Sequence, residues 1–100
     1  TTWIDTIPES ICIYQSLSDE DCFEINDQTK IKQIAAFINE DAFDWKEEVV
    51  TRQNTGVIDF GNLKIKVLYG DEIDLYFQSE KGTKMMKADP GFFELTNLPR

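Results

Sequence analysis

Cys12 and Cys22, ten positions apart, are the only cysteines of the chain, and an acidic run from Asp19 to Asp21 lies between them. Their spacing does not form a CxxC redox motif, and no lysine or arginine adjoins either cysteine to stabilise a thiolate. Two cysteines supply only half of the four ligands of a structural zinc site, and the chain has no histidine to complete the set. The pair therefore predicts one of two states, a disulfide or two free thiols.

The 19 acidic residues are the other groups that could do chemistry. They lie in clusters typical of exposed loops and turns, where carboxyl groups make poor general acids. The run at Asp19 begins like an EF-hand calcium loop, but Phe23 and Lys30 stand where that loop needs oxygen ligands. Without histidine there is no Ser-His or Cys-His pair, and the five glycines form no phosphate-binding loop. We therefore expect no enzyme activity, no metal site and no cofactor.

The net charge of −9 is concentrated in the first half of the chain. Residues 1–48 hold 12 acidic and 3 basic side chains, whereas residues 49–100 hold seven of each. A negative surface repels the phosphates of nucleic acids and anionic membranes, and it attracts basic proteins. The charge distribution therefore predicts a basic protein partner and no nucleic acid. The alternative is a solvated acidic surface that only keeps a small protein soluble.

The scaffold for these residues is expected to be one compact domain over residues 1–100, since 41% of the residues are hydrophobic. No apolar run approaches the roughly 20 residues that span a bilayer, so direct membrane insertion is not expected. Isoleucines recur at the spacing of an amphipathic helix between Asp27, a candidate N-cap, and Asn39, a candidate end. The periodicity of residues 40–50 fits a loop and a short helix equally well.

Apolar residues alternate in two segments around the cysteines, which predicts a pair of antiparallel strands before the helix. Placing Cys12 opposite Cys22 brings Ile11 opposite Phe23 and keeps the apolar side chains on one face of the sheet. In this register the two cysteines share the other face.

After the helix the apolar pattern changes to a period of two and predicts three or four meandering strands. Residues 54–56 and 61–62 are candidate turns. A two-residue turn at 61–62 places Asp59 opposite Lys64, and the apolar residues beside them also meet. Agreement between the turn chemistry and the pairing predicts a hairpin here.

The next strand is expected to turn Ile73 towards the core and Tyr76 towards solvent. Only one of the consecutive residues Met85 and Met86 can point into the core. The outer methionine and the tyrosines Tyr14 and Tyr76, flanked by Lys64, Lys66 and Lys84, would then form a protein-binding patch. The alternative is ordinary surface exposure of these side chains.

A short C-terminal helix is expected to begin at Pro90, with Asp89 as its cap. These elements predict an α+β fold, in which an antiparallel β-sheet of four to six strands carries one amphipathic helix packed on one face and a short C-terminal helix. Many unrelated small families share such a layout, among them bacterial lipoprotein-type domains and immunity proteins. The layout alone therefore does not identify the function.

The preferred hypothesis is a non-catalytic acidic binding protein, an inhibitor or immunity-type protein that neutralises a basic protein partner such as a toxin nuclease. Its partner-binding residues would be the acidic clusters with Trp45, or its neighbour Phe43, as an anchor: Asp19, Glu20, Asp21, Glu24, Glu40, Asp41, Asp44, Trp45, Glu47 and Glu48. A cytoplasmic location fits this hypothesis. The alternative is an extracytoplasmic structural or lipoprotein-type domain with a Cys12–Cys22 disulfide, whose charge serves only solubility.

Overall fold

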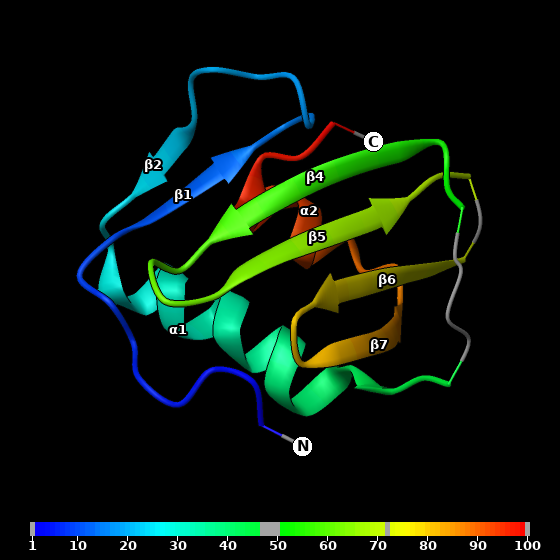
Figure 1. Ribbon diagram of the computed structural model, residues 1–100. Helices are drawn as coiled ribbons and strands as arrows, with labels where there is room; N and C mark the ends of the chain where they lie inside the picture. The colour runs from blue at the N-terminus through cyan, green and yellow to red at the C-terminus, as the bar shows by residue number, and fades with distance from the viewer. Residues whose placement is uncertain (1, 47–50, 72, 100) are drawn as a thin grey trace.

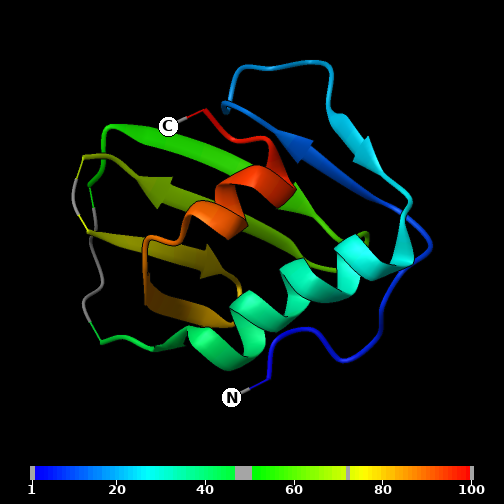
Figure 2. The same ribbon diagram turned by 180° about the vertical axis from the view of Figure 1, so that it is seen from behind.

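The computed structural model describes residues 2–46, 51–71 and 73–99, which form an antiparallel sheet with helices on one of its faces (Figure 1, Figure 2). The elements in chain order are β1 (Ile11–Tyr14), β2 (Phe23–Ile25), α1 (Gln28–Ala36), η1 (Phe37–Asp41), β3 (Phe43–Asp44), β4 (Asn54–Asp59), β5 (Lys64–Tyr69), β6 (Asp74–Ser79), β7 (Gly82–Lys87) and α2 (Pro90–Thr96). The strands lie in the order β2-β1-β4-β5-β6-β7-β3. The predicted α+β class is confirmed. The described sheet has seven strands rather than four to six, because the stretch that the sequence left open contributes the edge strand β3.

The first helix begins where the sequence predicts, but it ends later. The Asp27 side chain accepts hydrogen bonds from the backbone N–H groups of Thr29 and Lys30 at 2.9 and 3.4 Å, which caps the helix. α1 then runs directly into the π-helical turn η1, which ends at Asp41. The predicted end near Asn39 is therefore wrong.

Asn39 instead holds the N-terminal segment against the helix. Its Oδ1 accepts hydrogen bonds from the backbone N–H groups of Trp3 and Ile4, both at 3.1 Å, and its Nδ2 donates to the Ile4 carbonyl at 2.8 Å. Trp3 is buried and belongs to the hydrophobic core. One side chain thus fixes two residues of the N-terminal segment through three hydrogen bonds.

The second helix follows its predicted cap. The Asp89 carboxylate accepts a hydrogen bond from the backbone N–H of Gly91 at 2.7 Å, and Pro90 occupies the first turn. The helix ends at Asn97, which adopts the left-handed conformation common at this position. Figure 2 shows α2 beside α1 on the same face of the sheet. The fully buried Phe92 lies on its inner side.

The predicted hairpin at residues 61–62 is confirmed. Asp59 pairs with Lys64 and Ile58 pairs with Ile65, as the turn chemistry requires. Gly61 has a φ of +92°, which glycine adopts without strain, and its N–H donates to the Asp59 carboxylate at 2.8 Å. The turn is therefore held by its own residues.

The other predicted turn, at residues 54–56, is wrong, because these residues form the first half of β4. A Cβ atom on Gly56 would lie 2.6 Å from Cδ2 of Leu98 and 3.2 Å from the carbonyl oxygen of Tyr14. Glycine is needed here for the close approach of neighbouring chain segments, and not for a turn.

The β1–β2 pair forms, but in a different register from the predicted one. Cys12 lies opposite Glu24, and Ile11 lies opposite Ile25, so the pairing is shifted by two residues. Cys22 comes just before β2. A disulfide nevertheless joins Cys12 and Cys22, whose Cα atoms are 5.4 Å apart.

The expected directions of Ile73 and Lys84 are wrong, and so is the expected solvent exposure of Tyr76. Ile73 is 75% exposed and does not reach the core, and Lys84 faces inward and is only 1% exposed. Met86 is the methionine that points into the core. Because alternate residues of a strand face the same side of the sheet, Lys84 must face the core as well. Tyr76 lies on the outer face but is covered by neighbouring side chains.

The buried Lys84 has partners from three distant segments. Its Nζ donates to the Ile38 carbonyl at 3.1 Å and lies 5.1 Å from the centre of the Trp3 ring. Burial lowers the pKa of Lys84, and the carboxylate of Asp44 partly opposes this shift. The charge is therefore compensated inside the domain.

No helix within residues 2–46, 51–71 and 73–99 is long and apolar enough to cross a membrane.

We expect the Tyr69→Phe substitution to stabilise the protein by up to about 1 kcal/mol, because the buried Tyr69 hydroxyl has no hydrogen-bond partner among the described residues. Burial also raises the pKa of Tyr69. The unfolded tyrosine ionises near pH 10 while the folded one stays neutral, so the wild type loses stability as the pH rises above about 10. Urea unfolding at pH 7 and pH 10.5 measures both effects. Tyr14→Phe is the matched control, and a clear loss of stability in Tyr69→Phe would contradict the prediction.

Candidate functional site

The first acidic cluster lies in the loop between β1 and β2. Asp19, Glu20 and Asp21 are exposed there, and Glu24 is exposed on β2. The Cys12–Cys22 disulfide closes this loop. Asp19, Glu20 and Asp21 are therefore presented on a short covalent ring at one edge of the sheet, and Glu24 lies just outside this ring.

The second acidic cluster lies at the end of the first helix. Glu40 and Asp41 are exposed in η1, and Asp44 is exposed on β3. Trp45 follows directly, and its backbone N–H donates to the Thr83 carbonyl at 2.9 Å, which continues the alignment with β7. The predicted binding residues Glu47 and Glu48 lie outside the described part of the chain.

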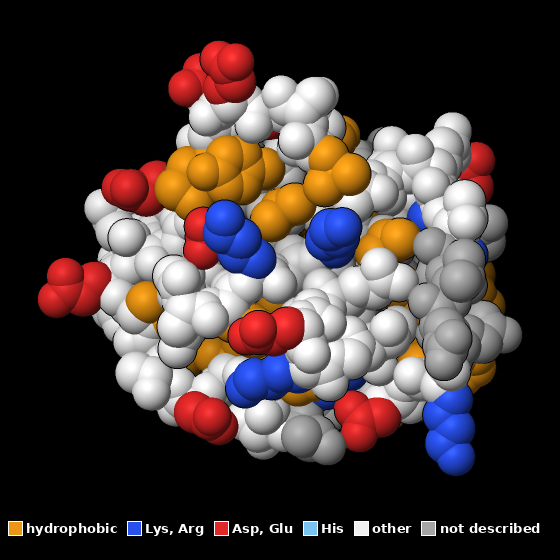
Figure 3. Space-filling model, in the orientation of Figure 1, with side chains coloured by type: hydrophobic (Ala, Val, Ile, Leu, Met, Phe, Trp, Pro, Cys, Tyr) orange, Lys and Arg blue, Asp and Glu red, His pale blue; other side chains and the backbone are white. Residues whose placement is uncertain are grey.

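The structure does not bring the two acidic clusters together. β2 and β3 are the opposite edges of the described sheet, with five strands between them. Figure 3, which views the outer face, shows acidic side chains scattered over it, many of them towards the rim, and basic side chains both near its middle and at its lower right rim. A partner that docks on one cluster would therefore leave the other uncovered, or would need to span the whole face.

A row of aromatic side chains runs from β3 across the outer face beside the second cluster, whereas the first cluster has the single half-exposed ring of Phe23 on β2. The rings of Phe43 and Trp45 lie 6.2 Å apart, and those of Trp45 and Tyr76 also lie 6.2 Å apart, both in edge-to-face contact. The guanidinium carbon of Arg52 lies 4.6 Å from the centre of the Tyr76 ring. We call Phe43, Trp45 and Tyr76 the aromatic row.

The exposed end of the aromatic row borders a shallow hollow of about 300 Å³. Phe43 and Trp45 line it together with Asp44 and Lys46, and Phe43 is 52% exposed. A large apolar side chain that remains half exposed beside a hollow is typical of an interaction surface. Phe43 is thus the side chain of this row with the most area to bury against a partner.

A second hollow, of about 440 Å³, opens between α1 and α2 on the helical face. Phe37 and Leu95 provide apolar walls, and Asp41 and Glu94 provide acidic ones. Asp41 adjoins this hollow, and Asp44 adjoins the hollow at Phe43. The acidic residues of the second cluster therefore lie between two surface depressions.

The sequence indicated part of this site and missed the rest. Phe43, Asp44 and Trp45 are neighbours in the chain, so their proximity could be predicted without knowledge of the tertiary structure. The contact of Trp45 with Tyr76 depends on the pairing of β3 with β7, which no pattern in the sequence indicated. The expected outward direction of Tyr76 was the only feature of the sequence that pointed to its contact with Trp45.

No group of three or more cysteine, aspartate or glutamate residues in the described part of the chain is placed to hold a metal ion. Comparison of the chain with protein-family models, curated proteins and solved structures finds no match.

Proposed function

We propose that this protein is a non-catalytic binding domain of the inhibitor or immunity type, which neutralises a basic protein partner such as a toxin nuclease. The observation that carries this proposal is the half-exposed ring of Phe43, which contacts Trp45 and closely follows the exposed Glu40 and Asp41 in the chain. An apolar anchor within a charged rim is the usual anatomy of a protein–protein contact.

The two kinds of side chain have separate roles in such a contact. Transfer of the Phe43 ring from water into a pocket of the partner provides about 1.5–3 kcal/mol at most, which makes it the main source of affinity. The carboxylates of Glu40 and Asp41 attract a basic surface from a distance and orient it, which mainly raises the association rate. Affinity should therefore depend on Phe43, and the salt dependence on the carboxylates.

A panel of purified basic nuclease domains provides the probe for this proposal. We expect at least one of them to bind, with an affinity that falls as the salt concentration rises, and to lose its nuclease activity in the complex. Phe43→Ala should weaken binding by about thirtyfold, which corresponds to about 2 kcal/mol. Charge reversal at Glu40 and Asp41 should lower the association rate. Calorimetry and stopped-flow kinetics measure these quantities.

The opposite edge of the sheet supplies the matched control. Charge reversal at Asp19 and Asp21 changes the net charge by the same amount as reversal at Glu40 and Asp41, yet it leaves the β3 edge unchanged. Asp44 is not a suitable target, because its carboxylate affects the buried Lys84. Equal losses from both reversals would contradict a contact at the β3 edge, and no binding across the panel would contradict the proposal itself.

The disulfide favours a second candidate, an extracytoplasmic structural or lipoprotein-type domain. Disulfides persist in oxidising compartments and are rare in the cytosol, so the Cys12–Cys22 bond supports an extracytoplasmic location. It supports that location for a binding protein as well. The two candidates differ in the role that they give to Phe43, because a purely structural domain would bind no partner through this side chain.

A further inference from the structure

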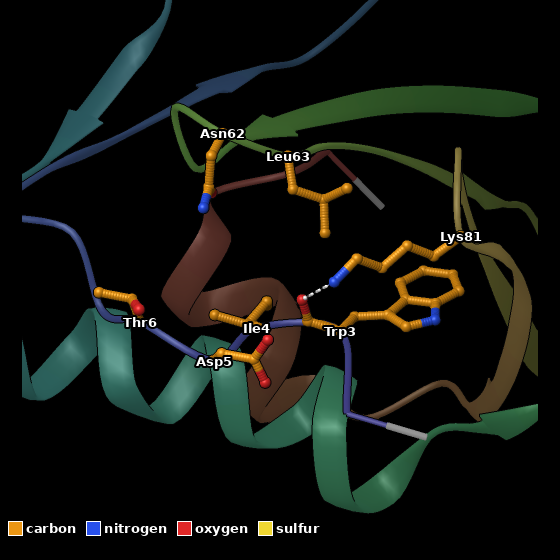
Figure 4. A pocket seen from close by; sticks show the side chains of 7 residues that line it. All are labelled: Trp3, Ile4, Asp5, Thr6, Asn62, Leu63 and Lys81. Atoms are coloured by element: carbon orange, nitrogen blue, oxygen red, sulfur yellow. Dashed lines mark hydrogen bonds between the residues drawn. The ribbon is translucent and has the colours of Figure 1, made fainter.

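A small pocket lies where the N-terminal segment meets the β4–β5 and β6–β7 turns (Figure 4). Its volume is about 190 Å³, and it shares no lining residue with the hollow at Phe43. Ile4 and Leu63 form apolar walls. Figure 4 shows Lys81 reaching in from one turn and Asn62 from the other, with Asp5 and Thr6 on the N-terminal segment.

Each wall of the pocket is held in place by its own interactions. The N-terminal wall is fixed by the three hydrogen bonds between Asn39 and residues 3 and 4. The β4–β5 turn is closed by the hydrogen bond from the Phe60 N–H to the Leu63 carbonyl at 2.9 Å. In the β6–β7 turn, the Lys81 N–H donates to the Ser79 hydroxyl at 3.0 Å. The pocket is therefore preorganised, which lowers the entropic cost of binding a ligand.

The polar groups of the pocket carry both charges. The Lys81 ammonium donates to the Trp3 carbonyl at 3.0 Å, which orients it along the pocket and leaves two of its three N–H groups for another acceptor. The side chains of Asp5, Thr6 and Asn62 also line the pocket. A cation and an amide donor thus share a small space with a carboxylate and a hydroxyl.

We propose that this pocket binds a small zwitterion of the α-amino acid class. Its carboxylate would accept hydrogen bonds from Lys81 and Asn62, and its ammonium group would donate to Asp5 and Thr6. The pocket volume of about 190 Å³ admits a small amino acid such as glycine, alanine or serine together with a few water molecules. The small side chain of such a ligand would face Ile4 and Leu63.

An NMR titration of the isotope-labelled protein with glycine, L-alanine and L-serine tests this proposal. Saturable shifts are expected in the amide signals of residues 3–6, 61–63 and 81. Acetate and methylammonium, each of which carries only one of the two charges, should bind at least about tenfold more weakly than the zwitterion.

Lys81→Met and Asp5→Asn should each weaken binding by at least about tenfold, since each removes one charged partner. Lys87→Met is the matched control, because Lys87 stands at the opposite end of β7. The signal of the Trp3 indole N–H reports whether the N-terminal segment stays in place in each variant. No saturable shift with any of the three amino acids overturns the proposal, as does unchanged affinity in Lys81→Met. Acetate binding as tight as that of alanine would show a simple anion site and would also overturn it.

Discussion

Phe92→Ala is expected to lower the free energy of unfolding by about 3–5 kcal/mol, the range found for large-to-small changes at fully buried aromatic positions. The Phe92 side chain is fully buried, and its ring lies between the rings of Phe37, Phe77 and Phe93 at centroid distances of 5.6, 5.4 and 5.8 Å. It joins the first helix, the sheet and α2 at one point. Because total stabilities of such domains are about 5–15 kcal/mol, a loss of this size should leave a partly unfolded protein. Urea unfolding followed by circular dichroism measures it.

Phe43→Ala is the matched control for this prediction, since the same side chain is removed from a position that is half exposed. It should cost less than about 1 kcal/mol, because little packing is lost. Phe92→Leu retains most of the buried volume and should fall between the two variants. Equal losses for Phe43→Ala and Phe92→Ala would contradict the packing described for α2.

Removal of the disulfide, by the double substitution Cys12→Ser and Cys22→Ser, is expected to cost about 2–3 kcal/mol. The bond closes a loop with a sequence separation of ten, and its loss gives the unfolded chain more conformations. The midpoint of urea unfolding should fall while its slope changes little. The edge strand β2 has three residues and few backbone hydrogen bonds of its own, so the loss should first loosen this edge.

Thiol labelling is the direct check on the bond itself. The native protein should take up no alkylating agent without reductant and two equivalents with reductant, as intact mass will show. The wild type in reductant should then match the double serine variant in stability. Two labelled thiols in the unreduced protein, or a stability change below about 0.5 kcal/mol, would contradict the disulfide and remove the support for an extracytoplasmic location.

The parts of the fold that the sequence predicted correctly are those with local causes. The Asp59–Lys64 hairpin depends on a two-residue turn, and the caps Asp27 and Asp89 act on residues two or three positions away. The register of β1 and β2 has no such cause. A shift by two residues leaves every side chain on the same face of the sheet, so the apolar pattern cannot distinguish Glu24 from Cys22 as the partner of Cys12.

Lys84 shows why a pattern of polarity fails inside the sheet. A lysine between apolar neighbours predicts an outward position, because the burial of an unpaired charge is costly. The structure compensates this cost with the Ile38 carbonyl, the Trp3 ring and the nearby Asp44 carboxylate. These groups lie far from Lys84 in the sequence.

The candidate site could be predicted only as separate pieces. The exposure of both acidic clusters follows from composition, but the distance between them depends on the strand order, which places β2 and β3 at opposite edges of the described sheet. The preference for the β3 edge comes from the aromatic row, whose member Tyr76 belongs to a different strand from Phe43.

The described sheet narrows towards both sides, because its four strands β4 to β7 have six residues each and its edge strands β2 and β3 have three and two. An edge strand offers free backbone groups on which another chain can add a strand, and long flat edges are the usual starting points of aggregation. Here the outer long strands β4 and β7 are partly covered, because β1 pairs with three residues of β4 and β3 pairs with two residues of β7, and the edge strands themselves are short. The taper should therefore keep the protein dispersed at concentrations where longer edges would assemble into fibrils.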